Sequence, residues 1–371
     1  MENRVCTRCV MDSIGDPNIK FAADGTCNYC SDALKAKQNL DISQRERLDK
    51  LKFVFDKIKE EGRGKKYDCM MGLSGGLDSS YAAFLAYKHG VRVLMVHVDD
   101  GFDAEVTTSN INKLCKALNF DLIIEKPSKE QFADLTKSFI LAGVPEIAIP
   151  QDNVLFACLY KYAKRNRIKY FLSGGNFALE NINMLENDAT DKVHILDIHK
   201  KFGKVPLDSE LPLFSIFEKR VKYQLFNRIK TVMPLNYVDY NAERALMEMN
   251  EAFGYEYYGN KHWESRFTKF LQVYYLPKKF GVDKRKLHFS SKIVSGQMTR
   301  EEAITKLAEP MYNEDEMNRE IDFIIGQLGM SRSEFDRIMA EPPRKHSDYR
   351  TSPFNRLVLF VLGIRKSILG Y

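Results

Sequence analysis

The chain has 371 residues, of which 44% are hydrophobic, and this size and composition predict a soluble globular protein of two domains or of one large domain with an appendage. Its formal net charge of +6 is a mild basic excess, which suits a small anionic substrate and falls short of the bias expected for binding nucleic acid. No apolar run is long enough to span a membrane, and the polar residues 1–4 do not begin a signal peptide, so we expect a cytoplasmic protein.

Four of the seven cysteines form two C-x2-C pairs near the N-terminus. The pair Cys6 and Cys9 is separated from the pair Cys27 and Cys30 by seventeen residues, a spacing typical of a tetrathiolate metal site. Zn²⁺ would have a structural role there, because four thiolates leave no open position for a substrate. Two disulfides are an alternative that a cytoplasmic setting disfavours, and the ligands alone do not exclude an iron–sulfur cluster. We therefore expect a metal-binding knob over residues 1–35.

Residues 36–64 are rich in charge and carry apolar side chains at roughly helical intervals, among them Leu48, Leu51, Phe55 and Ile58. This periodicity predicts one or two helices that link the knob to the next domain. The charged run at 57–66 is expected to be a solvated end.

Residues 67–90 carry the strongest signal in the chain. An apolar run typical of a buried strand precedes the turn LSGGLDSS at 73–80, and a segment with the composition of a helix follows it. Adjacent glycines let the backbone approach a ligand, and the free amides of the first helical turn attract anions. Since a bare carboxylate would repel phosphate, Asp78 is interpreted as a contact to Mg²⁺. The predicted ligand-binding residues of the turn are Ser74, Gly75, Gly76, Leu77, Asp78, Ser79 and Ser80.

The turn matches neither the GxxxxGK[ST] P-loop nor the GxGxxG motif. Its segment SGGLDSS resembles the PP-loop of the ATP pyrophosphatase superfamily, whose members split ATP into AMP and pyrophosphate while adenylating a carbonyl or amide oxygen. A purely structural glycine turn is disfavoured, because all seven positions match between a strand and a helix. The resemblance implies a PP-loop domain, expected over residues 65–235, that binds ATP and Mg²⁺.

Apolar runs and helical patterns alternate beyond the turn. The alternation predicts an α/β fold with a doubly wound parallel sheet, in which ligands bind at the carboxyl ends of the strands. The strands are expected near 91–98, 122–124 and 170–172, and the helices near 108–118, 129–141 and 153–166.

Two strand ends in this sheet are candidates for the nucleotide site. His97 and Val98 are expected beside the adenine, as in the superfamily, with packing as the alternative role of the histidine. Gly174, Gly175 and Asn176, followed by Glu180, resemble the second glycine turn of NAD synthetase, which lies near the α-phosphate and the metal. An ordinary strand-to-helix loop is the alternative here.

The C-terminal part, residues 236–371, is expected to be mostly helical and to bind the substrate or a partner. Charged and aromatic side chains concentrate at 255–291, around the only tryptophan, Trp263. Such a mixture suits a substrate with a phosphate or carboxylate, and a helical surface with solvated charges is the alternative. The predicted substrate-binding residues are His262, Glu264, Arg266, Lys284, Arg285 and Lys286.

Three further segments have patterns that predict local structure. Residues 188–203, a polar stretch with two histidines, are expected to be a loop near the substrate or plain surface. Residues 315–329 have helical periodicity. Residues 357–369 are too short to span a membrane and are expected to form a core or interface helix, with surface attachment as an alternative.

The cysteine pairs, the PP-loop and the stretches KHWESRFTKFLQ, LPKKFGVDKRKLH and SGQMTREEA together resemble the N-acetyl sugar amidotransferase family of bacterial lipopolysaccharide O-antigen and flagellin-glycan biosynthesis. The resemblance implies an enzyme that adenylates the carbonyl oxygen of a sugar N-acetyl group and substitutes ammonia, giving an acetamidino sugar. The substrate would be a sugar nucleotide or an acidic sugar. The implied catalytic residues are Ser74, Asp78, Lys261 and Arg285, with Asp78 and Glu180 at Mg²⁺.

The sequence contains no recognisable glutaminase triad motif, so ammonia is expected from a separate glutaminase. The resemblance implies a partner similar to the glutaminase and cyclase subunits of imidazole glycerol phosphate synthase, with the cyclase-like subunit docking on this chain. A tRNA thiolase with zinc knuckles is an alternative, which the isolated positions of Cys69, Cys115 and Cys158 disfavour. A binding protein with a degenerate nucleotide fold is another, which the intact PP-loop disfavours.

Overall fold

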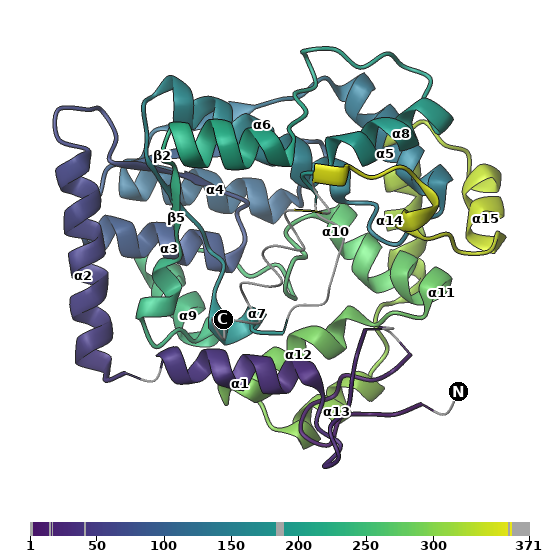
Figure 1. The fold of residues 1–371 in the computed structure, drawn as a ribbon, viewed down its shortest axis with the longest axis horizontal. Coiled ribbons are helices and arrows are strands. Elements are labelled where there is room, and N and C mark those ends of the chain that lie inside the picture. The colour runs from purple at the N-terminus through teal and green to yellow at the C-terminus, as the bar shows by residue number, and fades with distance from the viewer. Residues whose placement is uncertain are drawn as a thin grey trace.

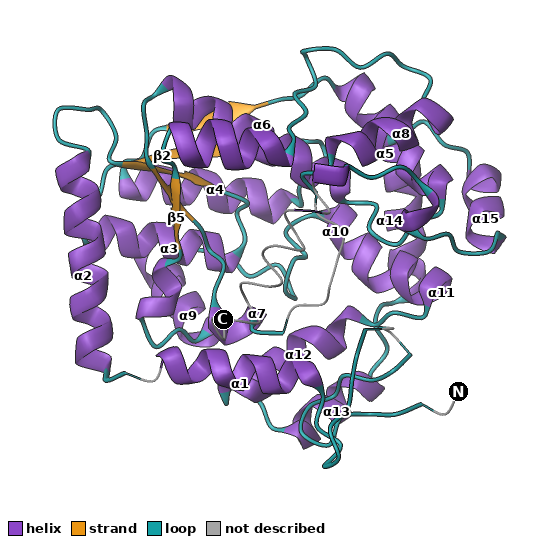
Figure 2. Ribbon diagram, viewed as in Figure 1, coloured by secondary structure: helices purple, strands orange, loops and turns teal. Residues whose placement is uncertain are grey.

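The computed structural model describes residues 3–14, 16, 18–40, 42–182, 189–354 and 357. At its centre lies a five-stranded sheet in the order β3-β2-β1-β4-β5, in which every strand is parallel to its neighbours (Figures 1 and 2). This arrangement confirms the predicted doubly wound parallel sheet and adds a fifth strand that was not predicted. The strands are β1 (Cys69–Gly72), β2 (Val93–Val98), β3 (Leu122–Glu125), β4 (Tyr170–Leu172) and β5 (Lys230–Val232).

Alternate residues of the central strands enter two different cores, because successive side chains of a strand point to opposite faces. Cys69 and Met71 of β1 pack into a core that includes Phe55 and Met249, while Met70 packs into a second core with Leu159. Helices α2, α3, α4 and α9 thus cover one face of the sheet, and α6 and the π-helix η1 cover the other. These helices are α2 (Gln44–Glu61), α3 (Leu77–Lys88), α4 (Glu105–Leu118), α6 (Ile149–Arg165), η1 (Glu218–Phe226) and α9 (Ala242–Phe253).

The N-terminal knob continues directly into a helix, because α1 (Asn28–Leu40) begins between the last two clustered cysteines. Helix α2 follows it, and its start is fixed by a capping box in which Ser43 and Glu46 satisfy each other's backbone amides. Helices therefore occupy most of the segment predicted to link the knob to the sheet. Figure 1 shows α1 lying beside α12 (Lys284–Ser295), at the opposite end of the chain.

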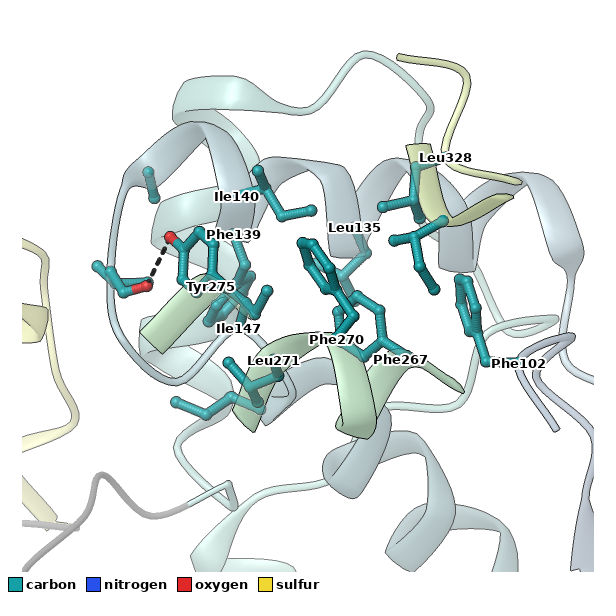
Figure 3. Close-up of a cluster of buried hydrophobic side chains, with 14 of the residues drawn as sticks. Phe102, Leu135, Phe139, Ile140, Ile147, Phe267, Phe270, Leu271, Tyr275 and Leu328 are labelled. Carbon is teal, nitrogen blue, oxygen red and sulfur yellow. Dashed lines mark hydrogen bonds between the residues drawn. The ribbon is translucent and has the colours of Figure 1, made fainter. Parts of the chain in front are cut away.

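The C-terminal part is helical and forms a third core together with α5 (Lys129–Ala142). Figure 3 shows Phe267 and Phe270 directed at Leu135 and Phe139 of α5. The hydroxyl of Tyr275 donates a hydrogen bond of 3.0 Å to the carbonyl of Val144, which satisfies the one polar atom of this buried ring. The remaining elements are η2 (Pro234–Tyr237), α7 (Phe177–Glu180), α10 (Arg266–Phe270), η3 (Leu271–Tyr275), α11 (Leu276–Phe280), α13 (Arg300–Ala308), α14 (Glu314–Gln327), α15 (Arg332–Ala340) and η4 (His346–Asp348).

One prediction from the sequence is wrong. Residues 192–202 form a helix, α8 (Lys192–Phe202), which packs against α5, whereas a loop or plain surface was expected at 188–203. Ile195 and Ile198 are fully buried, and this spacing of three residues was the helical signal that the polar neighbours concealed. The two histidines do not contact each other. His199 contacts Asp134 at 3.0 Å, and His194 contacts His346 at 3.0 Å.

Two other predictions fall on parts of the chain outside the described residues. These are Asp188, at the start of the expected loop, and all of the terminal apolar run 357–369 except Leu357. Among the residues that the structure does describe, no helix combines the length and the apolar character needed to cross a membrane.

Candidate active site

The site lies where the strand order of the sheet changes direction. Strands β2 and β3 extend to one side of β1, while β4 and β5 extend to the other, and ligands of such sheets bind outside the carboxyl ends of the strands at this point. The turn after β1 carries the PP-loop, and the turn after β4 carries Gly174. The two turns touch: a Cβ on Gly174 would lie 2.6 Å from the amide nitrogen of Ser79. Only glycine fits there.

The PP-loop is open to ligands on one side. Gly75 has a φ of +76°, and Gly76, the N-cap of the helix α3 that follows, provides no side-chain cap. In the first turn of α3, the amides of Asp78 and Ser79 form no backbone hydrogen bond within the described part of the chain, so they remain available to an anion. The hydroxyls of Ser74 and Ser79 lie 3.0 Å apart beside this turn. Ser80, by contrast, is 1% exposed, and its hydroxyl lies inside the protein.

Two tyrosines from the C-terminal part hold the PP-loop in place. The hydroxyl of Tyr255 donates a 2.8 Å hydrogen bond to the carbonyl of Gly75, and the amide of Leu77 donates one of 2.9 Å to the hydroxyl of Tyr258. Neither residue was a candidate from the sequence, because the two tyrosines lie about 180 positions away along the chain.

Lys261 joins two carboxylates at the edge of this loop. Its ammonium lies 2.7 Å from Asp78 and 2.9 Å from Glu180, and Tyr240 donates a short hydrogen bond to the other oxygen of Asp78. Burial alone would lower the pKa of Lys261, but the two carboxylates raise it above its ordinary value. The carboxylates of Asp78 and Glu180 therefore converge on one positive centre, an arrangement that a divalent cation between them would also satisfy.

The segment that carries Lys261 is attached to the loop between β2 and α4. The amide of Ala104 donates to the carbonyl of Glu264 at 3.0 Å, and the amide of Arg266 donates to the carbonyl of Phe102 at 2.8 Å. His262 has a φ of +67°, a conformation uncommon outside glycine. These contacts hold residues 261–266 beside the carboxyl ends of the strands.

The first of two cavities beside this cluster has a volume of about 460 Å³ and is called here the PP-loop cavity. His97 on its wall is held between the carbonyl of Leu73, at 2.9 Å, and the carboxylate of Asp103, at 2.7 Å. Burial lowers the pKa of His97, but Asp103 outweighs this and raises it overall. Asp103 was not predicted from the sequence as a partner of His97. The predicted residues that line the cavity are Ser74, His97, Val98, Gly174, His262, Glu264 and Lys284.

The second cavity, of about 260 Å³, lies beside α12 and is called here the α12 cavity. Lys284, His288 and Lys292 of α12 line it, together with Asp78 and Lys261. His288 and Lys292 were not among the residues predicted from the sequence, although the spacing of four places both on the same helix face as Lys284. The two cavities share the lining residues Gln272 and Lys284.

Three of the predicted substrate-binding charges are engaged elsewhere. Arg266 lies 2.8 Å from Glu320, and Lys286 pairs with Asp12 of the knob. Arg285 lines the α12 cavity, but its guanidinium binds Asp283 and the backbone carbonyls of residues 306, 307 and 309. In the second glycine turn, Asn176 is 4% exposed and caps α7, and a Cβ on Gly175 would lie 3.6 Å from the carboxylate of Glu180.

The four clustered cysteines are completely buried, and their sulfur atoms all lie within 4.8 Å of one another. The distances are 4.0 Å between Cys6 and Cys30 and 3.8 Å between Cys9 and Cys27. Four sulfurs bound to one Zn²⁺ at about 2.3 Å would be about 3.8 Å apart, so the cluster fits this metal. Backbone amides of Cys9, Met11, Cys27 and Cys30 point at the sulfurs, as expected around thiolates.

The cysteine knob packs against the helix that lines the α12 cavity. Ser290 of α12 accepts a 3.3 Å hydrogen bond from the amide of Val10, and Arg300 of α13 donates to the carbonyl of Cys9 at 3.2 Å. Helix α12 also contacts α7, and the side chain of Asn181, at the end of α7, donates a 2.7 Å hydrogen bond to the carbonyl of Ser291. The helix therefore connects the knob with the end of α7 that carries Glu180.

Comparison with known proteins identifies two regions of the chain. Residues 68–176 match the family model described as queuosine biosynthesis protein QueC, and residues 264–361 match the model described as LPS biosynthesis protein WbpG-like, C-terminal domain. The first region begins just before β1 and ends in the second glycine turn. The second begins at Glu264, on the wall of the PP-loop cavity.

The similar proteins are PP-loop enzymes. A probable mitochondrial tRNA-specific 2-thiouridylase 1 of Caenorhabditis elegans is 25% identical over 56% of this chain, which spans 59% of that protein's length. A 7-cyano-7-deazaguanine synthase of Pyrococcus abyssi is 25% identical over 49% of this chain and 76% of its own. A structure of NAD⁺ synthetase from Burkholderia pseudomallei aligns with 84% of this chain and 93% of its own, at 14% identity and a TM-score of 0.32. The chain is thus a homologue of PP-loop ATP pyrophosphatases that carries a C-terminal domain of the WbpG-like type known from LPS biosynthesis.

Proposed function

We propose that the protein is an ATP-dependent amidotransferase, which converts the acetamido group of a sugar into an acetamidino group in bacterial surface-polysaccharide or glycan biosynthesis. The observation that carries this proposal is the position of the WbpG-like domain. Its first residues, Glu264 and Arg266, form backbone hydrogen bonds with the loop between β2 and α4, so a domain type of LPS biosynthesis lies directly beside the PP-loop. The WbpG-like region favours a sugar substrate, and the PP-loop region favours ATP as the second substrate.

The reaction requires activation, because an amide carbonyl is a poor electrophile and its oxygen is a poor leaving group. In the proposed reaction the carbonyl oxygen attacks the α-phosphorus of ATP, and the bond to the β-phosphate breaks, which releases pyrophosphate. Ammonia then adds to the carbon of the adenylated group, and AMP leaves with the former carbonyl oxygen. The amidine has NH in place of that oxygen, and two protons are lost to the solvent or to bases of the site.

The residues of the PP-loop are suited to the phosphates of ATP. The amides of Asp78 and Ser79, together with the hydroxyls of Ser74 and Ser79, would bind the phosphates. His97 and Val98 would lie beside the adenosine. Asp78 and Glu180 would hold Mg²⁺, which supplies charge neutralisation at the phosphates when it is bound. Lys261 would then release one or both carboxylates and place its ammonium near the developing negative charge.

Ammonia must reach the site unprotonated, and free ammonium is the main form at neutral pH. We propose that a separate glutaminase supplies it, through a partner similar to the cyclase subunit of imidazole glycerol phosphate synthase. Such a partner would need access to the PP-loop cavity, where the adenylated group would lie.

A tRNA thiolase is the second candidate function, since one relative is a probable 2-thiouridylase. Its chemistry would use a reactive cysteine beside the PP-loop. The three cysteines outside the knob are buried, and burial raises the pKa of Cys69 well above its usual value, that of Cys115 to about 11 and that of Cys158 to about 12. Thiols of this kind are poor nucleophiles, so the amidotransferase is favoured.

The test is mass spectrometry of the products after incubation with ATP, Mg²⁺, ammonium and a di-N-acetylated UDP-sugar acid. The proposal expects the sugar to lose about one mass unit, as NH replaces oxygen, with one AMP formed for each sugar converted. The variant Asp78→Asn should abolish both signals. AMP formation that depends on tRNA and not on the sugar would establish the thiolase instead.

A further inference from the structure

Helix α12 presents one face to the α12 cavity. Lys284, His288 and Lys292 recur at intervals of four residues, so they stand one above another on that face. The exposed Lys306 of α13 adds a fourth basic side chain at the rim. No residue of this set except Lys284 was among the candidates from the sequence.

The positive charge of the cavity exceeds its negative charge. Five cationic side chains and two carboxylates line it. Some of the cations are paired, since Lys261 contacts Asp78 at 2.7 Å and Lys284 contacts Glu146 at 3.3 Å. The ammonium groups of Lys292 and Lys306, however, form no ion pair or hydrogen bond within the part of the chain that the structure describes.

Burial and the excess of positive charge lower the pKa values of basic groups on this helix face. Burial and then the charge of Lys306 lower the pKa of Lys292, and burial together with His262 and Lys261 lowers that of His288 well below its usual value. A bound anion would offset both effects, because it stabilises the protonated forms of its neighbours. Aromatic side chains also line the cavity, among them Tyr257, Trp263 and Phe289. Such a wall suits the flat faces of a sugar or a base.

We propose that the α12 cavity binds the charged end of the acceptor, a group with two or more negative charges such as a nucleoside diphosphate, in a site separate from that of ATP. The two unpaired ammonium groups, of Lys292 and Lys306, carry two positive charges, which a ligand with two negative charges would neutralise. Asp78 and Lys261 line the same cavity, so an acceptor held there has its other end beside the PP-loop. The assignment to the acceptor rests on the proposed function, whereas the anion site itself does not.

The phosphates of ATP are the other source of the same chemistry, since Leu77 and Asp78 of the PP-loop helix also border the cavity. The two sources differ in one measurable respect. An acceptor site must accept a diphosphate while ATP is bound, and a pyrophosphate site of ATP cannot.

Isothermal titration calorimetry of the full chain separates these sources. UDP is titrated into protein saturated with Mg²⁺ and α,β-methylene-ATP, whose α–β bond is not cleaved. We expect one UDP to bind per chain, and we expect Lys292→Met and Lys306→Met each to weaken UDP by about tenfold while the ATP analogue changes less than about twofold. The control Lys116→Met, which removes an exposed charge from α4, should change neither affinity.

Three outcomes would overturn the inference: no UDP binding to the analogue-saturated protein, competition between UDP and the analogue, or weaker analogue binding in Lys292→Met. The exposed position of Lys306 keeps the test valid if Lys292→Met does not fold. Failure of the proposed function is recognised separately, because UDP binding is measured without turnover. UDP binding that depends on Lys292, combined with no conversion of any acetamido sugar, would retain the site and reject the amidotransferase.

Discussion

The ammonium of Lys261 lies 2.7 Å from the carboxylate of Asp78, although 183 positions separate the two residues in the chain. The same ammonium contacts Glu180 at 2.9 Å, so it occupies the position where a divalent cation would bind both carboxylates. We propose that Lys261 competes with a metal in the absence of nucleotide and becomes available to the phosphates in its presence.

The variant Lys261→Met tests both roles. Without the competing ammonium, Mn²⁺ should bind the nucleotide-free protein more tightly than it binds the wild type, as measured by electron paramagnetic resonance. Formation of AMP should fall by about 10² or more, because a preorganised cation beside the transferring group is lost. Lys261→Arg keeps the charge and serves as the control for metal competition. Weaker Mn²⁺ binding in Lys261→Met would contradict the competition.

The variant Gly174→Ala tests the contact between the two glycine turns. An added Cβ would lie 2.6 Å from the amide nitrogen of Ser79, and that atom belongs to a helix backbone that cannot move freely. We expect a loss of about 1–3 kcal/mol in the free energy of unfolding and at least tenfold weaker binding of α,β-methylene-ATP. The control is Gly326→Ala in α14, where a Cβ meets nothing within 4 Å, so stability should stay the same or rise. Equal effects of both substitutions would contradict a specific contact.

The sequence could predict the parts of the site that are local. Strand, glycine turn and helix follow one another within residues 67–90, and the two C-x2-C pairs define their own cluster, so neither depended on the path of the rest of the chain. The spacing of four between Lys284, His288 and Lys292 was equally local. Neighbouring basic residues such as Lys286, which belong to other faces of the helix, conceal this spacing in the sequence.

The contacts between distant segments could not be predicted in this way. Tyr255 reaches the carbonyl of Gly75, and Arg266 turns away from the cavities toward Glu320, because of how the chain packs after residue 253. Local composition does not encode that path. The same limit explains why basic residues of similar appearance, Lys284 and Lys286, face the cavities and the knob respectively.

Disruption of the four-cysteine cluster should weaken binding of the acceptor more than binding of ATP. The knob supports α12 through Ser290, while the PP-loop is held by Tyr255 and Tyr258. In Cys27→Ser we expect loss of bound zinc by elemental analysis, a lower melting temperature and weaker UDP binding, with affinity for α,β-methylene-ATP reduced much less. Cys115→Ala, in α4, should retain the zinc. An equal loss of both affinities would mean that the knob stabilises the whole chain and not α12 in particular.

Stability should fall in acid because of a buried pair of histidines. His346 accepts a 3.3 Å hydrogen bond from the amide of Glu146 and lies 3.0 Å from His194, whose other nitrogen contacts the carbonyl of Arg350. Burial and the neighbouring His194 lower the pKa of His346 to about 3, against about 6.5 in an unfolded chain. Between these values the unfolded state binds the additional proton, so the free energy of unfolding decreases as the pH falls from about 6.5 toward 3, by up to about 1.4 kcal/mol per unit.

Urea unfolding at several pH values measures this slope. In His346→Gln the slope between about pH 6 and 4 should become shallower, because glutamine keeps a polar side chain near the amide of Glu146 and does not titrate. The control is His89→Gln, at a half-buried position of the α3 terminus, where burial lowers the pKa of the histidine and its ring partner among the described residues is Phe55 and not a second histidine. Its slope should change less than that of His346→Gln. A slope in His346→Gln equal to that of the wild type would show that other groups, and not this pair, cause the loss of stability in acid.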